Sequence, residues 1–244
     1  MDNRLRKLEL KTLLTALADF FLPRVCVVCG RMLIPAEKHI CLECLEDLPL
    51  TRFEKQSRNP MADRLNAALP DEDRYAYATA LFFYSSGPGY DNITKALKYR
   101  GNLGEGRYFA SMLGKRLALS PHLADVDAVV CVPLHPLRRW RRGYNQAEVI
   151  GKSVAAELGV PLVRGAIRRK RRTDSQTTRN AEQRRANLSG AFASDGKGLE
   201  GYRHILIVDD VFTTGATLAS CLQALRAALG KDVRLSVATL ACVE

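Results

Sequence analysis

The sequence lacks an apolar run long enough to cross a membrane, which takes about 20 residues. Its most apolar early segment, Leu10–Leu22, is interrupted by Lys11 and Asp19 and is followed by Pro23 rather than by a small-residue cleavage site. A membrane span and a secretory signal are therefore not expected. Leucines and phenylalanines recur here at steps of three and four residues, which predicts an amphipathic helix over residues 1–22. It packs on the protein itself or contacts a partner or membrane surface; the sequence leaves both open.

Cysteines number only seven, and an odd number without a secretory signal argues against a disulfide framework. Four of them form two Cys-x2-Cys pairs, Cys26 with Cys29 and Cys41 with Cys44. Each short gap aims two sulfurs at one point, so the pairs together predict a structural zinc ion held by four thiolates. Two disulfides are the alternative. We expect His39 to be a bystander and the protein to be cytoplasmic.

Acidic residues are scarce between Arg138 and Arg185, where 14 basic residues face four acids and supply nearly all of the net charge of +11. A localised positive field attracts the phosphates of small ligands or of nucleic acid, although a solvated surface is the alternative. The single tryptophan, Trp140, lies among four of these arginines. It stacks on a base of single-stranded DNA or anchors local packing, and the sequence does not decide between them.

The order of elements predicts an α/β domain with a mostly parallel sheet and helices on both faces. We expect a zinc module at 23–50, a polar linker at 51–74 and the α/β domain at 75–244. Within that domain the patterns predict strands at 75–84, 128–132, 162–167, 204–208 and 233–243, and helices at 93–99, 106–119, 145–158 and 216–229. Asn145 and Gly159 with Pro161 are the expected start and stop signals of the third helix, and Glu148 would complete a capping box.

The segment HILIVDDVFTTGAT, residues 204–217, combines a buried strand, two adjacent acids and a threonine-rich turn before a helix. Asp209 and Asp210 repel each other, and a vicinal diol or hydrated Mg²⁺ would compensate for this. They converge on one ligand only if the chain has already turned at this point. The turn at 213–217 offers unpaired amides, hydroxyls and the positive end of a helix dipole, which suits a phosphate. Together these groups predict a ribose 5-phosphate site; a turn aspartate with threonine caps is the alternative.

The segment VDDVFTTGAT resembles the signature by which type I phosphoribosyltransferases bind phosphoribosyl pyrophosphate. The chain as a whole resembles the ComF family of competence-related proteins. That second resemblance rests on the cysteine pairs, Lys98-Tyr99-Arg100-Gly101, Val132-Pro133-Leu134-His135-Pro136, Arg142-Gly143-Tyr144-Asn145-Gln146, Ser175-Gln176 and Arg184-x2-Asn187. It implies a type I phosphoribosyltransferase fold with an N-terminal zinc module.

The resemblance also implies roles for individual residues. Asp209 and Asp210 would hold the ribose hydroxyls and Mg²⁺ would accompany phosphoribosyl pyrophosphate. The 5′-phosphate and its surroundings would be held by Val211, Thr213, Thr214, Gly215, Ala216 and Thr217. A pyrophosphate loop would include Pro133, Leu134, His135, Arg142 and Gly143, with His135 equally consistent with a surface histidine. A flexible loop over 168–187 would contribute Gln176, Arg184 and Asn187.

Two functions follow from the resemblance. The first is a phosphoribosyltransferase linked to DNA uptake and natural transformation, whose acceptor the sequence does not reveal. The second is a protein that binds single-stranded DNA and keeps the fold for ligand sensing, without glycosyl transfer.

Overall fold

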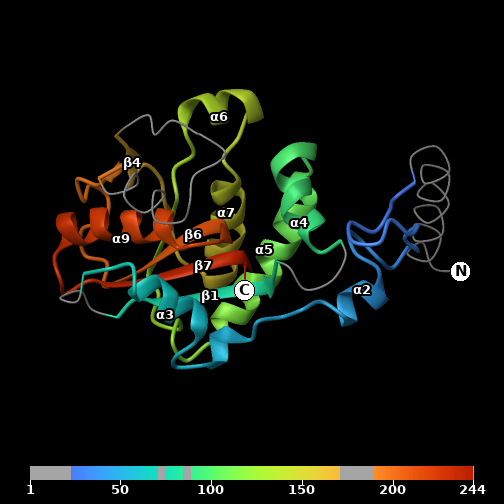
Figure 1. The fold of residues 1–244 in the computed structure, drawn as a ribbon, viewed down its shortest axis with the longest axis horizontal. Coiled ribbons are helices and arrows are strands. Elements are labelled where there is room, and N and C mark those ends of the chain that lie inside the picture. The colour runs from blue at the N-terminus through green and yellow to red at the C-terminus, as the bar shows by residue number, and fades with distance from the viewer. Residues whose placement is uncertain (1–22, 71–74, 85–88, 171–189, 244) are drawn as a thin grey trace, which may run out of the picture.

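A computed structural model describes residues 23–70, 75–84, 89–170 and 190–243 (Figure 1). The helix expected over 1–22 lies outside these residues, as do Gln176, Arg184 and Asn187. A five-stranded sheet forms the centre, with every pair of neighbours parallel. In spatial order its strands are β1 (Tyr77–Phe83), β7 (Arg234–Cys242), β6 (His204–Phe212), β2 (Ala128–Cys131) and β3 (Leu162–Val163). None of the helices in these ranges is both long and apolar enough to span a bilayer.

Helices cover both faces of the sheet, as alternation along β6 requires. Ile205 and Ile207 point into one apolar cluster, and Leu206 and Val208 into the other. The first cluster includes side chains of α3 (Pro60–Asn66) and α9 (Ala216–Leu229). The second includes side chains of α4 (Asp91–Lys95), α5 (Leu103–Ala118) and α7 (Gln146–Leu158). The expected parallel α/β architecture is therefore confirmed.

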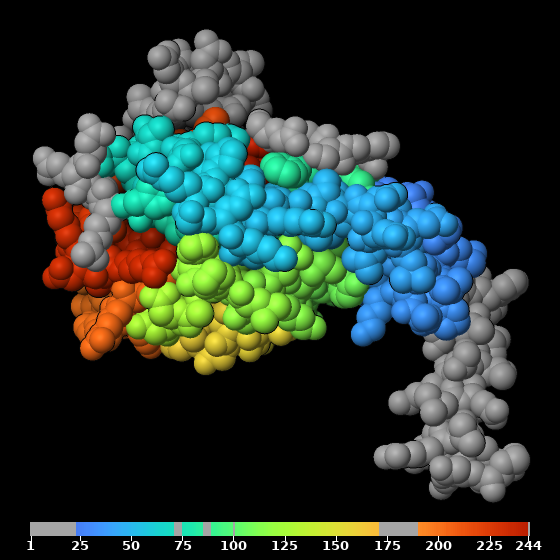
Figure 2. Space-filling model, turned by 90° about the horizontal axis from the view of Figure 1, so that it is seen from below, coloured from blue at the N-terminus to red at the C-terminus, as the bar shows by residue number. Residues whose placement is uncertain are grey.

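The segment that we expected to be a linker is packed against the sheet where the structure describes it, at 51–70. It contains the 3-10 helix η1 (Phe53–Lys55) and α3, and Met61 and Leu65 are fully buried. The Asn59 side chain caps α3 and also donates to the Ala78 carbonyl of β1. In the view of Figure 2 this segment, in cyan, runs along the surface from the blue N-terminal module to the opposite end of the molecule. Its polar residues face outward and its few apolar ones inward, which the sequence pattern concealed.

The cysteine module forms one end of the molecule and rests on α4 and α5 (Figure 1). It includes the short helix α2 (Leu42–Glu46). The Tyr90 hydroxyl donates to the Cys44 carbonyl at 3.1 Å, and the His39 ring stacks on Tyr108 of α5 with centroids 5.5 Å apart. His39 is therefore a docking residue, consistent with its expected role as a bystander to the cysteines.

Strand boundaries differ from expectation at two places. β6 continues to Phe212 and pairs there with Cys242, so the two acids lie within the last turns of the strand rather than after it. β3 is only two residues long, because Gly165 with φ 76° redirects the chain into the short hairpin of β4 (Arg168–Arg169) and β5 (Phe192–Ala193). Asn145 and Gly159 delimit α7 as expected, although Asn145 accepts from Ala147 rather than from the amide of Glu148.

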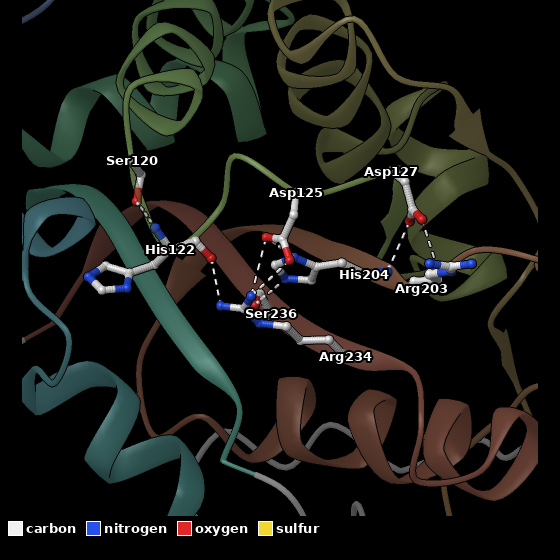
Figure 3. A network of polar contacts seen from close by, with 8 residues as sticks. All are labelled: Ser120, His122, Asp125, Asp127, Arg203, His204, Arg234 and Ser236. Atoms are coloured by element: carbon white, nitrogen blue, oxygen red, sulfur yellow. Dashed lines mark hydrogen bonds and ion pairs between the residues drawn. The ribbon is translucent and has the colours of Figure 1, made fainter.

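A polar network fixes the start of β6 and β7, at the other end of the strands from the acids (Figure 3). The buried His204 ring contacts Asp125 through Nδ1 and Ser236 through Nε2, both at 2.8 Å. Arg234 donates to the other oxygen of Asp125, and Asp127 accepts from the amide of His204. With these buried groups satisfied, this edge of the sheet is closed, and the carboxyl edge is left for chemistry.

Candidate functional site

The two acids reach the carboxyl edge of the sheet on the central strand β6. Asp209 and Asp210 are both partly buried, and the Asp209 carboxylate accepts a hydrogen bond from the amide of Asp210 at 2.9 Å. The expected turn before the acids is absent, because β6 stays extended to Phe212. The carboxylate of Asp209 instead folds back on the backbone. The idea that a prior turn brings the two acids together is therefore wrong.

Lys98 is the cation nearest to the acids among the ion pairs of the described residues. Its Nζ lies 3.2 Å from Oδ2 of Asp210, and the two side chains are 24% and 15% exposed. Asp209 has no such partner in these ranges, and burial together with the charge of Asp210 raises its pKa to about 8. The pair therefore consists of one neutralised carboxylate and one held close to its protonated form, which is costly for the protein and suits a site that a ligand completes.

This pKa shift has a consequence for stability. The pKa of Asp209 is higher in the folded state than in the unfolded chain, so ionisation of this group disfavours folding as the pH rises from about 4 to about 8. We expect Asp209→Asn to raise the melting temperature at pH 8, by at least about 1 kcal/mol in free energy of unfolding, and to change it little at pH 4. Thermal denaturation at both pH values tests this. Equal melting temperatures for the two proteins at pH 8 would contradict it.

The turn at 213–217 begins α9 with unpaired backbone donors. Within the described residues, the only acceptor for these amides is Oγ1 of Thr214, which lies 3.5 Å from the amide nitrogen of Ala216. The first helical backbone bond runs from Ala219 to the Gly215 carbonyl. Thr213 is exposed, and Thr214 and Thr217 are partly buried. Free amides, hydroxyls and the helix dipole together make this turn a cradle for an anion.

Gly215 and Arg64 hold the turn in shape. Gly215 has φ 76°, and a Cβ there would come within 2.8 Å of the Phe212 ring. Arg64 of α3 lies over the same ring, 5.2 Å from its centroid, and donates to the carbonyls of Thr213 and Val243. Arg64 lies in the segment expected to be a linker, and nothing in the local pattern distinguishes it from other surface arginines.

The loop after β2 contains the residues expected to grip pyrophosphate. It forms the short helix α6 (Pro136–Arg142), capped by Nδ1 of His135, which accepts from the Leu137 amide at 3.2 Å, and ended by Gly143 with φ 76°. His135 thus has at least a structural role here. The guanidinium of Arg142 lies over the Tyr99 ring, 5.4 Å from its centroid.

Two cavities flank α6. One, of about 260 Å³, is lined in part by Pro133, Leu134 and Arg139. The other, of about 720 Å³, is lined by Lys98, Tyr99, Gly101, Arg138, Arg141, Arg142 and Tyr144. The larger cavity therefore shares Lys98 with the acidic pair, which connects the loop after β2 to the end of β6.

Gln146, the first residue of α7, is 2% exposed, and its amide nitrogen has no hydrogen-bond partner among the described residues. A buried amide without a partner is costly in a folded protein. It directly follows the loop after β2, which is consistent with a site that a ligand completes.

The four cysteines of the module are arranged as a metal site. Their sulfurs lie within 4.8 Å of one another, and the sulfurs of Cys29 and Cys41 are 3.8 Å apart. Burial raises the pKa of Cys26, but hydrogen bonds from the amides of Cys29, Cys41 and Val28 outweigh it and lower the pKa to about 7. Amides that stabilise thiolates and sulfurs at this spacing allow the cluster to hold a metal ion.

Comparisons with known proteins agree with this geometry. Residues 145–241 match the family model described as the phosphoribosyl transferase domain, which includes both acids and the turn after them. The chain is 39% identical over 101 residues to competence protein F of Haemophilus influenzae, covering 41% of this chain and 44% of that protein. It is 39% identical over 99 residues to DNA utilization protein YhgH of Escherichia coli K12, covering 41% and 43%.

A third relative matches a longer part of the chain. Competence protein ComFC of Streptococcus pneumoniae is 29% identical over 137 residues, covering 56% of this chain and 57% of that protein. The chain is a ComF relative with a phosphoribosyltransferase fold. It matches less than half of the length of the first two relatives.

The structure brings most of the expected residues of this ComF relative to one edge of the sheet, but two contributors were missed. Lys98 was noted only as part of a motif, and Arg64 was not noted at all. Both reach the site from elements far away in sequence, so no local spacing could have revealed their partners.

Proposed function

We propose that this chain binds phosphoribosyl pyrophosphate with Mg²⁺ and transfers its phosphoribosyl group to an acceptor, as part of the uptake or use of DNA. The observation that carries the proposal is the sequence of groups at the end of β6. Two acids, one of them with a raised pKa, are followed directly by a turn with unpaired amides at the start of α9. Both lie inside the match to the phosphoribosyl transferase domain.

Each group has a role in this proposal. Asp209 and Asp210 accept hydrogen bonds from the ribose hydroxyls, and the turn from Thr213 to Thr217 holds the 5′-phosphate. Arg142 and the backbone of the loop after β2 bind the pyrophosphate. Transfer breaks the bond between the anomeric carbon and the pyrophosphate oxygen and forms one to the acceptor, so that negative charge builds on the leaving group. Nearby arginines stabilise that charge.

Two metal ions belong to the proposal. The four thiols fit Zn²⁺, whose tetrahedral bonds of about 2.3 Å place sulfurs about 3.8 Å apart. This matches the separation of the Cys29 and Cys41 sulfurs. A closed set of four sulfurs makes the role structural. Mg²⁺ would neutralise the phosphates of the ligand beside the acids. The expected cytoplasmic location remains a prediction.

Calorimetric titration with phosphoribosyl pyrophosphate and Mg²⁺ tests the proposed ligand, and a pyrophosphate-release assay with candidate acceptors tests transfer. We expect saturable binding that requires Mg²⁺. No heat and no displacement of a competing anion at millimolar ligand would refute the proposal.

The names of the relatives, competence protein and DNA utilization protein, support a link to DNA. Match to a transferase domain favours the first hypothesis over a DNA-binding protein without transfer, but the two activities are compatible. Trp140 is 84% exposed on α6, so it is not the packing anchor that the sequence also allowed. An exposed aromatic between arginines is suited to stacking on a base of single-stranded DNA.

We expect Trp140→Ala to weaken binding of a single-stranded oligonucleotide by about 1–3 kcal/mol. Replacing both Arg138 and Arg141 with Gln should reduce the slope of log K against log salt by about 1.4, because two phosphate contacts are lost. Fluorescence anisotropy across a salt series measures both effects. Leu137→Ala is the matched control, since Leu137 is 52% exposed on the same helix. The same loss of affinity in the control would rule out stacking by Trp140.

A further inference from the structure

Lys98 occupies the carboxylate that the proposed sugar needs. Its Nζ is 3.2 Å from Oδ2 of Asp210, so the ion pair uses lone pairs that a ribose hydroxyl would require. We propose that Lys98 is a ligand-exchanged cation: it neutralises Asp210 in the free protein and pairs with the pyrophosphoryl group of the bound ligand. The inference rests on the proposed function and adds a binding residue from outside the loop after β2.

The backbone at Lys98 is held from two sides. Lys98 lies on η2 (Ala96–Arg100), a π-helical turn that continues α4. Leu97 is fully buried, and a Cβ on Gly106 of α5 would come within 2.6 Å of it, so the two pack in direct contact. The Leu97 carbonyl accepts from the hydroxyl of Tyr144, close to the start of α7. Single π-helical turns within helices are frequent at functional sites, where they redirect side chains.

The side chain of Lys98 is freer than its backbone. It is 24% exposed, and its four-carbon stem carries a compact ammonium group that can change partners without moving the main chain. Asp210 is less exposed, at 15%, and lies next to Asp209. A carboxylate in this position requires a positive partner whenever no ligand is bound, and Lys98 is the one that the geometry provides.

A second partner for Lys98 would enter the cavity of about 720 Å³ between η2 and α6. The lining of this cavity includes Arg138, Arg141 and Arg142 in addition to Lys98, and none of its lining residues is acidic. Four cations around one space attract a multiply charged anion. A pyrophosphoryl group placed there can take Lys98 while the ribose hydroxyls take Asp210, so the ligand replaces both halves of the ion pair at once.

This exchange discriminates between two related ligands. Phosphoribosyl pyrophosphate supplies a new partner for Lys98, whereas ribose 5-phosphate breaks the ion pair and leaves the lysine uncompensated. Lys98 should therefore favour the pyrophosphorylated sugar. Loss of the lysine should reduce that preference rather than weaken both ligands equally.

The test is calorimetry of both ligands, with Mg²⁺, on the full chain and on Lys98→Gln. We expect the variant to lose about 10- to 100-fold in affinity for phosphoribosyl pyrophosphate, as for one charge-assisted contact. Its affinity for ribose 5-phosphate should stay the same or increase. Lys98→Arg keeps the charge and should recover most of the preference. Because the preference is a ratio measured within one protein, a partly unfolded sample changes it little.

Lys95→Gln is the matched control, because Lys95 lies one turn earlier, is 49% exposed and pairs with Asp91 on its own helix. It should leave the ratio of the two affinities at the native value. An unchanged ratio in Lys98→Gln, with binding otherwise intact, overturns the role of Lys98 and leaves the proposed function standing. A native protein that binds neither sugar overturns both.

Discussion

Asp210→Asn is expected to reduce binding of phosphoribosyl pyrophosphate by at least about 100-fold and to abolish pyrophosphate release. The amide keeps the size of the side chain but loses the charge that a diol and Mg²⁺ require. It also strands Lys98, which lies 3.2 Å from Asp210, without its carboxylate. Loss of a charge-assisted contact and an unpaired charge in a partly buried site act in the same direction, each by about 1.5–3 kcal/mol. Calorimetry and a pyrophosphate assay measure the two effects.

A matched control separates this local effect from general loss of acidity. Asp232 is exposed in the turn before β7, and Asp232→Asn removes the same charge far from the cradle. It should bind and turn over as the native protein does. Native affinity in Asp210→Asn would show that the pair of acids does not hold the sugar.

The second large effect is expected at the cysteine module. Cys41 is fully buried, accepts from the amide of Cys44 and lies 3.8 Å from the sulfur of Cys29. Cys41→Ser should remove the bound metal, because a neutral hydroxyl is a poor replacement for a thiolate. Since binding of a structural zinc ion is coupled to folding, we expect the module to unfold when the metal is lost.

Metal analysis should find about one zinc ion per native chain and none in Cys41→Ser. Protease digestion should then cut the variant within 23–50 well before it cuts the sheet. Cys131→Ser is the control, because a serine hydroxyl can keep the hydrogen bond from this side chain to the Ala147 carbonyl. A native protein that contains no metal after purification without chelators, yet resists digestion, would contradict the prediction.

The sequence predicted those parts of the fold that depend on local patterns. Alternation around Ile205 to Val208 predicted a strand buried on both faces, and Asn145 and Gly159 gave α7 its limits. Pairs of cysteines two residues apart predicted a cluster, because a short turn brings their sulfurs together whatever surrounds them.

The remainder depends on contacts between distant segments. Lys98 meets Asp210 more than 100 residues along the chain, and Arg64 reaches Thr213 across 149 positions. The expected linker packs on the sheet because a few apolar residues in a polar segment, Met61 and Leu65 among them, suffice for a short helix. The end of β6 was misplaced because adjacent acids resemble a turn, whereas pairing with β7 keeps them extended.

The strand order has a practical consequence for anyone who isolates the catalytic half. Residues 145–241, the part that matches the domain family, contain β3, β6 and β7. Yet β2 lies between β6 and β3, and β1 covers the outer side of β7. A fragment cut at 145 would expose two bare strand edges and self-associate. Recombinant work on this protein should begin no later than the residues that precede α3.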